Sequence, residues 1–405
     1  MAWYVTKLEP SKEKEIICKA ENDLHPNWKM LGTVLLYQST DFDFKKSIII
    51  TEMSNCLLKP MNRYRILNKF VEPSVEVNKE FIIKIYSEAE NKSLVLLCNE
   101  ITYKRGTMYI IKKKLELLTE ILDIPILAIF SLRKNCFAKP FTGMWRLLNA
   151  YYLQKVNYKV SDCIVVSDNG GLIENMEKKI QINDYDMAFA HNIGFPFYTI
   201  NEYVDGTVEK KTWNNFIISP ETRLLYDQQI KNIENPNIFK LLGEFGKKNS
   251  YIIMIIGPPS SGKTRLAKLI IAKWRASKFG EKNAIFYIGW SSFQKFKNCV
   301  NDKISVILDN NRYTNSMRNP YIKYAQEYDV PILFIDVNPG IEMAKIFEMA
   351  KIETAESDRV YRKNDEKYYM YKSLYERPSV NSPLLKYTQY VPHIEATPQI
   401  MTFRY

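Results

Sequence analysis

An apolar run, Tyr251 to Ile256, is followed directly by Gly257-Pro258-Pro259-Ser260-Ser261-Gly262-Lys263-Thr264 and then by the amphipathic segment Arg265 to Trp274. The run predicts a buried strand, the last segment predicts a helix, and the eight residues between them fit G-x-x-x-x-G-K-[ST] without a mismatch. In this arrangement backbone N–H groups surround a phosphate, the lysine reaches the terminal phosphates, and the hydroxyl binds Mg²⁺. We therefore expect an ATP-type site in which Gly257 to Thr264 bind the phosphates. A chance glycine turn is the alternative.

Two later apolar runs end in an acidic residue. Asp309 follows Val306-Ile307-Leu308, and Asp336 follows Leu333-Phe334-Ile335. Either carboxylate is placed to bind the water shell of a metal ion, although a strand-end aspartate that caps the next helix has the same pattern. We expect the metal site to consist of Thr264 and Asp309.

Short apolar, β-branched runs alternate with longer amphipathic segments, which is the pattern of βαβ units on parallel sheets. In the first half the expected strands are 47–51, 94–98, 124–130 and 163–166. Helices are expected over 68–85 and over 107–121, the second with Leu115, Leu118 and Ile121 on one face. In the second half the expected strands are 251–256, 284–288, 304–308 and 332–337.

A polar stretch over 233–250, with Pro236, Gly243 and Gly246, is the best domain boundary. At 405 residues the chain is long enough for two or three domains, and two is the simplest interpretation. The expected order is an N-terminal extension at 1–27, a first α/β domain at 28–235, a linker at 236–250 and a P-loop domain at 251–405.

The composition is that of a folded protein, with 46% hydrophobic and 25% charged residues. A formal charge of +12 favours polyanionic partners such as nucleic acid, although a solvated lysine-rich surface gives the same total. Six single cysteines without a CxxC pair predict buried reduced thiols rather than a zinc site. Because neither a secretory signal nor an apolar run of membrane-spanning length is found, we expect a soluble intracellular protein.

Three segments of the first half point to one family. They are Ala138-Lys139-Pro140-Phe141-Thr142-Gly143-Met144-Trp145, Val165-Val166-Ser167-Asp168-Asn169-Gly170-Gly171 and Asn192-Ile193-Gly194-Phe195-Pro196-Phe197. They resemble the K-P-x-T-G-M-W, V-G-D-x-x-G and N-x-G-x-P-F segments of the bifunctional polynucleotide kinase 3′-phosphatase family, in that family's order. The P-loop half resembles the kinase domain of the same family, so the resemblance runs from about Trp28 to about Pro378. The forkhead-associated domain of animal members is not found.

The resemblance implies a haloacid-dehalogenase-like domain followed by a P-loop kinase domain. It further implies ATP and Mg²⁺ as cofactors and DNA ends or single-stranded nucleic acid as partners. A nuclear, DNA-repair setting and a monomeric state, without membrane attachment, complete the expectation.

The phosphatase motifs of that family are altered in this chain. Glu52 stands at the family's aspartate nucleophile and is one methylene longer, while Ser54 stands at its general acid and has no proton to donate near neutral pH. The family's F-T-N-Q reads Leu97-Cys98-Asn99-Glu100, so a phosphate-binding hydroxyl has become a thiol. Lys139 and Asp168 remain, either as a charge-stabilising lysine and a metal-ligating acid or as a structural salt bridge. We expect phosphatase chemistry to be lost, with Glu52 a doubtful nucleophile.

The kinase motifs depart from the family beyond the phosphate loop. Ser291 stands where the family's N-R-D-T provides the base for a DNA 5′-hydroxyl, and Trp290 replaces its arginine. The lid segment Lys345 to Lys351 offers lysines, which lack the bidentate fork of arginine. Arg359 or Arg362 would have to substitute.

The favoured function is binding of ATP and DNA ends in a repair-related setting, with kinase chemistry in doubt and Lys263 as the main catalytic group retained. One alternative is a working ATP-dependent polynucleotide 5′-hydroxyl kinase whose base is Asp302 or Asp309. Another is a non-catalytic interaction protein, in which the interspersed tyrosines and lysines of 361–375 contact single-stranded ends.

Overall fold

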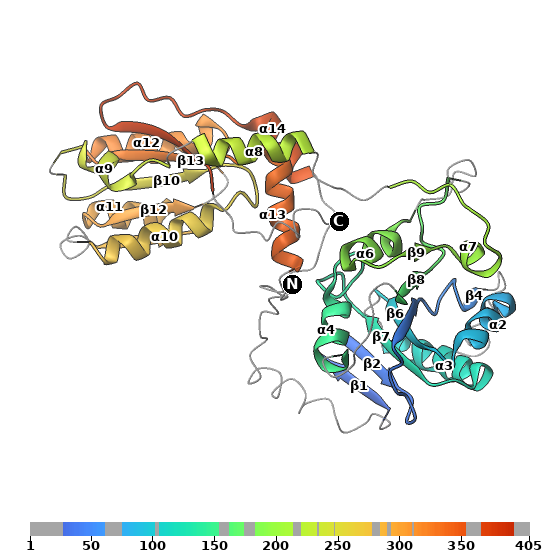
Figure 1. Cartoon of the computed structure of the whole chain (residues 1–405). Coiled ribbons are helices and arrows are strands. Elements are labelled where there is room, and N and C mark those ends of the chain that lie inside the picture. Colours follow the sequence, from blue (N-terminus) through green and yellow to red (C-terminus); the bar gives the residue numbers. More distant parts are fainter. Residues whose placement is uncertain are drawn as a thin grey trace. The chain divides into compact units, whose positions relative to one another are not determined.

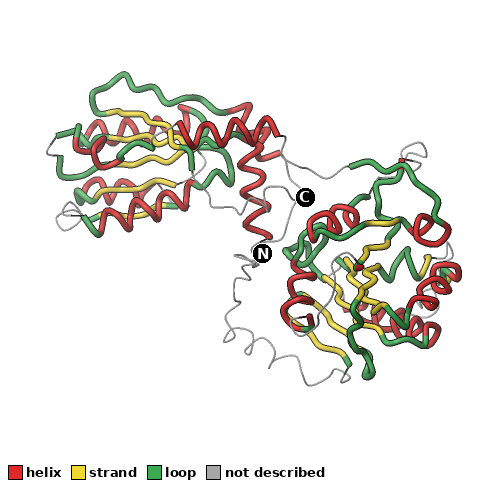
Figure 2. Tube along the Cα trace, in the orientation of Figure 1, coloured by secondary structure: helices red, strands yellow, loops and turns green. Residues whose placement is uncertain are grey.

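The chain divides into two compact units in the computed structural model (Figure 1), and each is described by itself. The structure describes residues 27–60, 75–101, 105–153, 162–173, 183–213, 220–232, 235–246, 248–277, 284–289, 293–309, 312–353 and 366–392. Unit 1 comprises Met1–Ile217, Lys351–Arg362 and Thr402–Tyr405, and unit 2 comprises Ile218–Ala350 and Lys363–Met401. Strands form the centre of both units and helices cover them (Figure 2), so the predicted α/β fold class is confirmed.

Unit 1 is built on a seven-stranded sheet with the order β1-β2-β7-β6-β3-β8-β9. The strands from β7 to β9 run parallel, whereas β1 and β2 form an antiparallel hairpin that the sequence did not predict. The elements of the unit are β1 Trp28–Leu31, β2 Val34–Gln38, β3 Ser47–Thr51, β4 Leu58–Pro60, β5 Val75–Val77, α2 Lys79–Glu88, β6 Lys92–Asn99, α3 Arg105–Leu122, β7 Ile126–Ser131, α4 Gly143–Tyr151, β8 Ile164–Val166, α6 Tyr185–Ile193, β9 Phe197–Tyr198 and α7 Ile200–Asp205.

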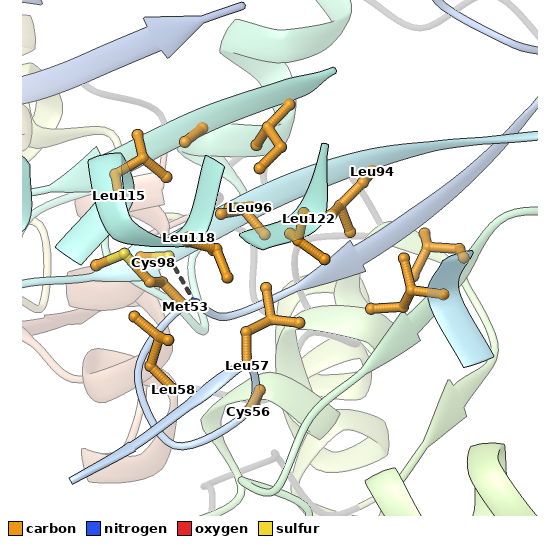
Figure 3. Packing of buried hydrophobic residues seen from close by; sticks show 14 of the residues in the cluster. Met53, Cys56, Leu57, Leu58, Leu94, Leu96, Cys98, Leu115, Leu118 and Leu122 are labelled. Carbon is orange, nitrogen blue, oxygen red and sulfur yellow. Dashed lines mark hydrogen bonds between the residues drawn. The ribbon is translucent and has the colours of Figure 1, made fainter. Parts of the chain in front are cut away.

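Both faces of this sheet are buried, because α2 and α3 cover one of them and α4 and α6 cover the other. The stripe of α3 that enters the core consists of Ile111, Leu115, Leu118 and Leu122. Figure 3 shows the three leucines of this stripe packed around Leu94, Leu96 and the segment that follows β3. The predicted core position of Ile121 is wrong. Its side chain is 42% exposed, because the next residue, Leu122, takes the core-facing position.

Unit 2 contains a five-stranded, wholly parallel sheet with the order β11-β12-β10-β13-β14. Counted within the unit, this order is 2-3-1-4-5, so the first strand lies at the centre. The elements are α8 Pro220–Asn232, α9 Ile238–Gly243, β10 Ile252–Ile256, α10 Lys263–Arg275, β11 Ile285–Ile288, α11 Phe293–Asn301, β12 Ser305–Asp309, α12 Asn315–Glu327, β13 Ile332–Val337, α13 Ile341–Glu353, α14 Glu366–Leu374 and β14 Leu385–Tyr390.

The central strand β10 is buried along its whole length, as its uninterrupted apolar sequence predicts. Its side chains alternate between two cores, one closed by α9 and α10 and the other by α11 and α12. The sheet therefore carries helices on both faces. The carboxyl ends of β10, β12 and β13 meet at one edge of the sheet, and the phosphate loop begins there.

The boundaries differ from those predicted. Residues 218–235, assigned to the first domain, belong to unit 2, and the expected linker 236–250 contains α9, whose Leu242 packs in the core of unit 2. The expected helix over 68–85 begins only at Lys79, because Val75–Val77 pair with β4 as strand β5. Residues 61–74 and the extension 1–26 lie outside the described residues.

The cysteines that the structure describes are all buried and free, which confirms the expectation of reduced thiols for them, while Cys18 lies outside the described residues. Among the described helices, none combines the length and the apolar character needed to cross a membrane.

Candidate functional sites

The phosphate loop of unit 2 connects β10 to α10 through backbone conformations that its glycines permit. Gly257 has φ +139°, and a Cβ atom there would lie 2.2 Å from the carbonyl oxygen of Val337. Gly262 has φ +97° and directly precedes the first residue of α10. Both positions lie in the region that glycine tolerates best. The loop therefore curls tightly at the amino end of α10, where a helix favours an anion.

The side chains inside the loop suit a phosphate ligand. The Lys263 ammonium donates hydrogen bonds to the carbonyl oxygens of Gly257 (2.9 Å) and Pro258 (2.6 Å), so it lies folded over the loop. The hydroxyl of Ser261 is fully buried and has no hydrogen-bond partner among the described residues. A buried hydroxyl without a partner is costly, and a phosphate oxygen would supply the missing acceptor. These residues fit the triphosphate of ATP.

Asp309, the last residue of β12, contacts the metal-binding hydroxyl predicted from the sequence. Its Oδ2 accepts hydrogen bonds from the Thr264 hydroxyl (2.6 Å) and from the Tyr287 phenol of β11 (2.7 Å). Burial, and after it the hydrogen bond to Asp309, raises the pKa of Tyr287 to about 12. A hydroxyl that donates to a carboxylate keeps its lone pairs for a metal ion. Thr264 and Asp309 would thus hold Mg²⁺ and its water shell, and the metal would neutralise phosphate charge.

The second acid considered, Asp336, serves a different network. It is almost fully buried at the end of β13, and its Oδ2 accepts hydrogen bonds from the phenols of Tyr375 and Tyr387. Burial raises the pKa of this carboxyl group. Since Asp336 bonds to these tyrosines and no contact with Thr264 is found among the described residues, Asp309 is the better metal candidate.

The structure separates the two acids proposed as replacement bases. Asp302 lies in the turn between α11 and β12, at the amino end of the strand, whereas Asp309 closes the carboxyl end beside the phosphate loop. Asp302 is therefore at the wrong edge of the sheet, and that hypothesis is wrong. Trp290, Ser291, Arg359 and Arg362 lie outside the described residues. In the lid segment on α13, the ammonium of Lys345 lies over the ring of Tyr368.

In unit 1 Glu52 and Lys139, two residues expected from the phosphatase resemblance, form a closed ring of side chains with Asn169 and Asp186. Glu52 directly follows β3, and its Oε1 lies 2.5 Å from the Lys139 ammonium, which also forms an ion pair with Asp186. The amide nitrogen of Asn169 donates to Asp186 Oδ2 (2.8 Å) and to Glu52 Oε2 (3.1 Å), which completes the ring. Lys139 therefore pairs with Glu52 and Asp186. The structural alternative, a salt bridge between Lys139 and Asp168, is wrong.

Two asparagines position the lysine of this ring. The side chain of Asn99, at the end of β6, accepts from the backbone N–H of Lys139 (2.9 Å) and donates to its carbonyl (3.1 Å). The side-chain amide of Asn192 on α6 donates to the carbonyl of Pro140 (2.9 Å). Because Asp186 lies nearly two turns earlier on α6, this helix supplies both an anchor for the lysine segment and one of its carboxylate partners.

Burial dominates the electrostatics of the ring. Burial first, and then the charge of Asp186, raise the pKa of Glu52 to about 8 although Lys139 acts in the opposite direction. Burial alone would lower the pKa of Lys139, but the carboxylates of Asp186 and Glu52 outweigh it and the pKa is raised. At neutral pH the ring therefore holds a charged lysine and a largely protonated Glu52.

Ser54 and Cys98, two further residues in the segments that resemble phosphatase motifs, form hydrogen bonds with residues outside the ring. The hydroxyl of Ser54 donates to Glu100 Oε1 (3.0 Å) and accepts from the ammonium of Lys114 (3.3 Å). The Cys98 thiol accepts from the backbone N–H of Met53 (3.3 Å), the bond drawn in Figure 3. Burial raises the pKa of Cys98 well above its usual range, so the thiol stays protonated.

Asp168 lies apart from the ring and faces a cavity of about 440 Å³. Its carboxylate accepts a hydrogen bond from the Cys56 thiol (3.5 Å), and burial, followed by the charge of Asp186, raises the pKa of Asp168 to about 6. The other charged residues lining the cavity are Lys59, Glu80, Asp205 and Glu209. An acidic majority repels a polyanion. In the described part of the chain, no group of three or more His, Cys, Asp or Glu side chains is arranged to hold a metal ion.

Sequence reasoning missed Asp186, Asn169 and Tyr287. Asn169 stands inside the V-G-D-x-x-G-like segment, and Asp186 precedes the N-x-G-x-P-F-like segment by six residues, so both lay beside motifs that had been identified. Tyr287 precedes Ser291, which stands where the resemblance places the kinase base, by four residues. Each of these residues lies in or near a segment that resembles a family motif, but no sequence pattern identifies the residue itself.

Comparisons with known proteins relate this chain to one family. Residues 39–204 match the family model described as Polynucleotide kinase 3 phosphatase. The bifunctional polynucleotide phosphatase/kinase of Schizosaccharomyces pombe is 27% identical over 266 residues, which are 63% of this chain. The match spans 58% of the length of that relative.

Two solved structures show slighter likeness. The structure of Chaetomium thermophilum Kti12 in complex with ADP-AlF3 is 20% identical and matches 38% of this chain and 94% of that chain, with a TM-score of 0.27. The structure of APE1195 is 16% identical and matches 38% of this chain and 89% of that chain, with a TM-score of 0.24.

The family match spans β3 to α7 and therefore includes Glu52, Lys139, Asp168 and Asp186. Together, the family model, which matches residues 39–204, and the Schizosaccharomyces pombe relative confirm the resemblance found in the sequence, and the chain is similar to the polynucleotide kinase 3′-phosphatase family.

Proposed function

We propose that this protein binds ATP with Mg²⁺ at Gly257 to Thr264 and binds DNA ends in a nuclear, repair-related setting. The observation that carries the nucleotide site is the combination of the curled phosphate loop, the buried Ser261 hydroxyl and the Thr264–Asp309 hydrogen bond. Loop N–H groups, Lys263 and Thr264 act on a bound nucleotide before any chemistry takes place. Nucleotide binding can therefore persist whether or not a phosphoryl group is transferred.

Phosphatase chemistry is lost in this proposal, and the ring of unit 1 supports that view. A lysine that stabilises phosphate charge has to be available to a phosphate, whereas Lys139 is paired with Glu52 and Asp186. A nucleophilic carboxylate has to be ionised and aligned within well under an ångström. Glu52 is longer than aspartate, largely protonated near neutral pH and held by Asn169.

The alternative kinase function rests on Asp309. Its carboxylate lies at the edge of the sheet where the phosphate loop opens, and it accepts hydrogen bonds from two hydroxyls at 2.6 and 2.7 Å. Both are protein hydroxyls, so they show that Asp309 accepts hydrogen bonds, and a base needs a similar reach of about 2.6–3.2 Å to the acceptor hydroxyl. A working 5′-hydroxyl kinase would use Asp309 in this role, in place of the base missing at position 291.

Calorimetry with ATP and Mg²⁺ tests the nucleotide site. Lys263→Ala should weaken ATP binding, whereas Lys268→Ala, an exposed lysine on the same helix, should leave it unchanged. At about 100 times its dissociation constant, ATP should stabilise the folded protein by about 2.7 kcal/mol, which is measurable as a rise in melting temperature. Absence of both heat of binding and thermal shift in the wild type would refute ATP binding.

A paired activity assay then separates the candidate functions. Transfer of phosphate from ATP to a 5′-hydroxyl oligonucleotide, lost in Asp309→Asn, would establish the kinase. Release of phosphate from a 3′-phosphorylated oligonucleotide should stay at background. Mg²⁺-dependent release that disappears in Glu52→Gln would show that the longer carboxylate attacks after all. ATP and DNA binding without turnover would support the favoured function.

A further inference from the structure

Tyr287 is an unpredicted member of the nucleotide site. It lies on β11, at the edge of the sheet of unit 2, and pairs there with Ile307 of β12. Its side chain is 38% exposed, yet its hydroxyl lies 2.7 Å from Asp309 Oδ2. A tyrosine that only filled the core would have its ring covered. Here the ring is partly in solvent and the hydroxyl is bound inside the site.

The backbone next to Tyr287 leaves room for this orientation. A Cβ atom at Gly289 would lie 3.3 Å from the Tyr287 hydroxyl and 3.4 Å from its ring. The phenol therefore folds back over a residue without a side chain. Contacts of this length are tighter than most that real Cβ atoms make, so a side chain at position 289 would press on the phenol.

The two hydroxyls that meet at Asp309 have different tasks. Thr264 begins with one proton and two lone pairs, and a metal ion requires a lone pair. The proton must therefore point away from the metal, and Asp309 Oδ2 accepts it. The Tyr287 hydroxyl donates to the same oxygen and holds this acceptor in place. Without the phenol, Asp309 Oδ2 would keep the hydrogen bond from Thr264 but lose the second bond that holds it, so the acceptor of the Thr264 proton would be less firmly placed.

We propose that Tyr287 is a positioning residue of the nucleotide site: by fixing Asp309 against Thr264, it makes nucleotide binding depend on Mg²⁺. This inference rests on the ATP binding proposed above. Tyr287 touches neither phosphate nor metal in this role. It acts through Asp309, so its removal affects the metal-dependent part of the affinity and leaves the contacts of Lys263 and the loop N–H groups intact.

The test compares ATP dissociation constants measured by calorimetry in excess Mg²⁺ and in EDTA, with the full chain. The ratio of the two constants measures how strongly the metal assists the nucleotide. Tyr287→Phe should lower this ratio about tenfold, since a hydrogen bond to a charged group contributes roughly one decade of affinity. The EDTA value should stay within about twofold of the wild type.

The matched control is Tyr324→Phe on α12. This substitution also removes a phenol that donates a 2.7 Å hydrogen bond, in this case to Asn301 and away from the site. Its ratio should equal that of the wild type. Gly289→Ala should lower the ratio in the same direction as Tyr287→Phe and should have no further effect when the two are combined, because both act on the same phenol.

Three outcomes are distinguishable. A fall of the ratio in Tyr287→Phe with an unchanged EDTA constant supports the inference. An unchanged ratio, or an equal loss of affinity in both buffers, overturns it and leaves ATP binding standing. If the wild type binds ATP in neither buffer, the proposed nucleotide site fails, and the role of Tyr287 fails with it.

Discussion

Replacing Lys139 by methionine would break the ring of unit 1 while keeping most of the buried volume. The lysine side chain is nearly inaccessible and its ammonium is paired with Glu52 and Asp186. Removing one partner of a buried ion pair costs about 3–5 kcal/mol, because the remaining charge stays buried without compensation. We therefore expect Lys139→Met to destabilise unit 1 by about that amount.

Hydrogen exchange followed by mass spectrometry localises this loss. Amides of β3 and β8, the neighbouring strands from whose ends Glu52 and Asn169 project, should exchange roughly two to four orders of magnitude faster, at about one decade per 1.4 kcal/mol. The matched control is Lys113→Met, which removes an exposed ion pair with Glu116 on α3 of the same unit and should change nothing measurable.

The cost should also depend on pH. Near pH 6, Glu52 is protonated and the substitution removes only the partner of Asp186. Above the pKa of Glu52, which lies at about 8, the lysine compensates two carboxylates, so the loss should be larger at pH 9 than at pH 6. If exchange at β3 and β8 in Lys139→Met matches that in Lys113→Met at both pH values, the ring does not stabilise the unit and the reasoning is refuted.

Two further predictions concern the wild type. The pKa of Glu52 is raised from 4.5 to about 8, so between these pH values the folded state keeps a proton that the unfolded state releases. The free energy of unfolding should therefore fall as the pH rises from about 4.5 to about 8. Urea unfolding should show this slope, and Glu52→Gln should flatten it. Binding to a single-stranded or recessed DNA end should weaken roughly a thousandfold between about 50 and 200 mM salt if about six phosphates are contacted, and an affinity that does not change with salt would exclude an electrostatic mode.

The phosphate loop was predictable because all of its determinants are local. Gly257 to Thr264 form one uninterrupted segment between a strand and a helix, and the structure places each part where the pattern predicts it. Asp309 was also predictable, as the end of an apolar strand. Its neighbour on the sheet, and hence its contact with Thr264, was not, because strand order is set by the packing of distant segments.

The ring of unit 1 escaped prediction for the same reason. Its four members come from the ends of β3 and β8, from the loop before α4 and from α6, and only the folded sheet brings them together. Residue identity suggested that Lys139 and Asp168 would form the surviving pair. Asp186 competes for the lysine from a helix whose amphipathic pattern gives no sign of an inward-facing carboxylate, although it is 1% exposed.

The ring also constrains what can change in this protein over time. Glu52→Asp would shorten the side chain by one methylene and draw its carboxyl group away from Lys139. Replacing Asp186 would leave Glu52 as the remaining ion-pair partner of Lys139 in the ring. If phosphatase chemistry is lost, as proposed above, each single substitution towards a phosphatase site would give a less stable chain, because a buried charge loses its partner. Several substitutions would then have to occur together for the chemistry to return.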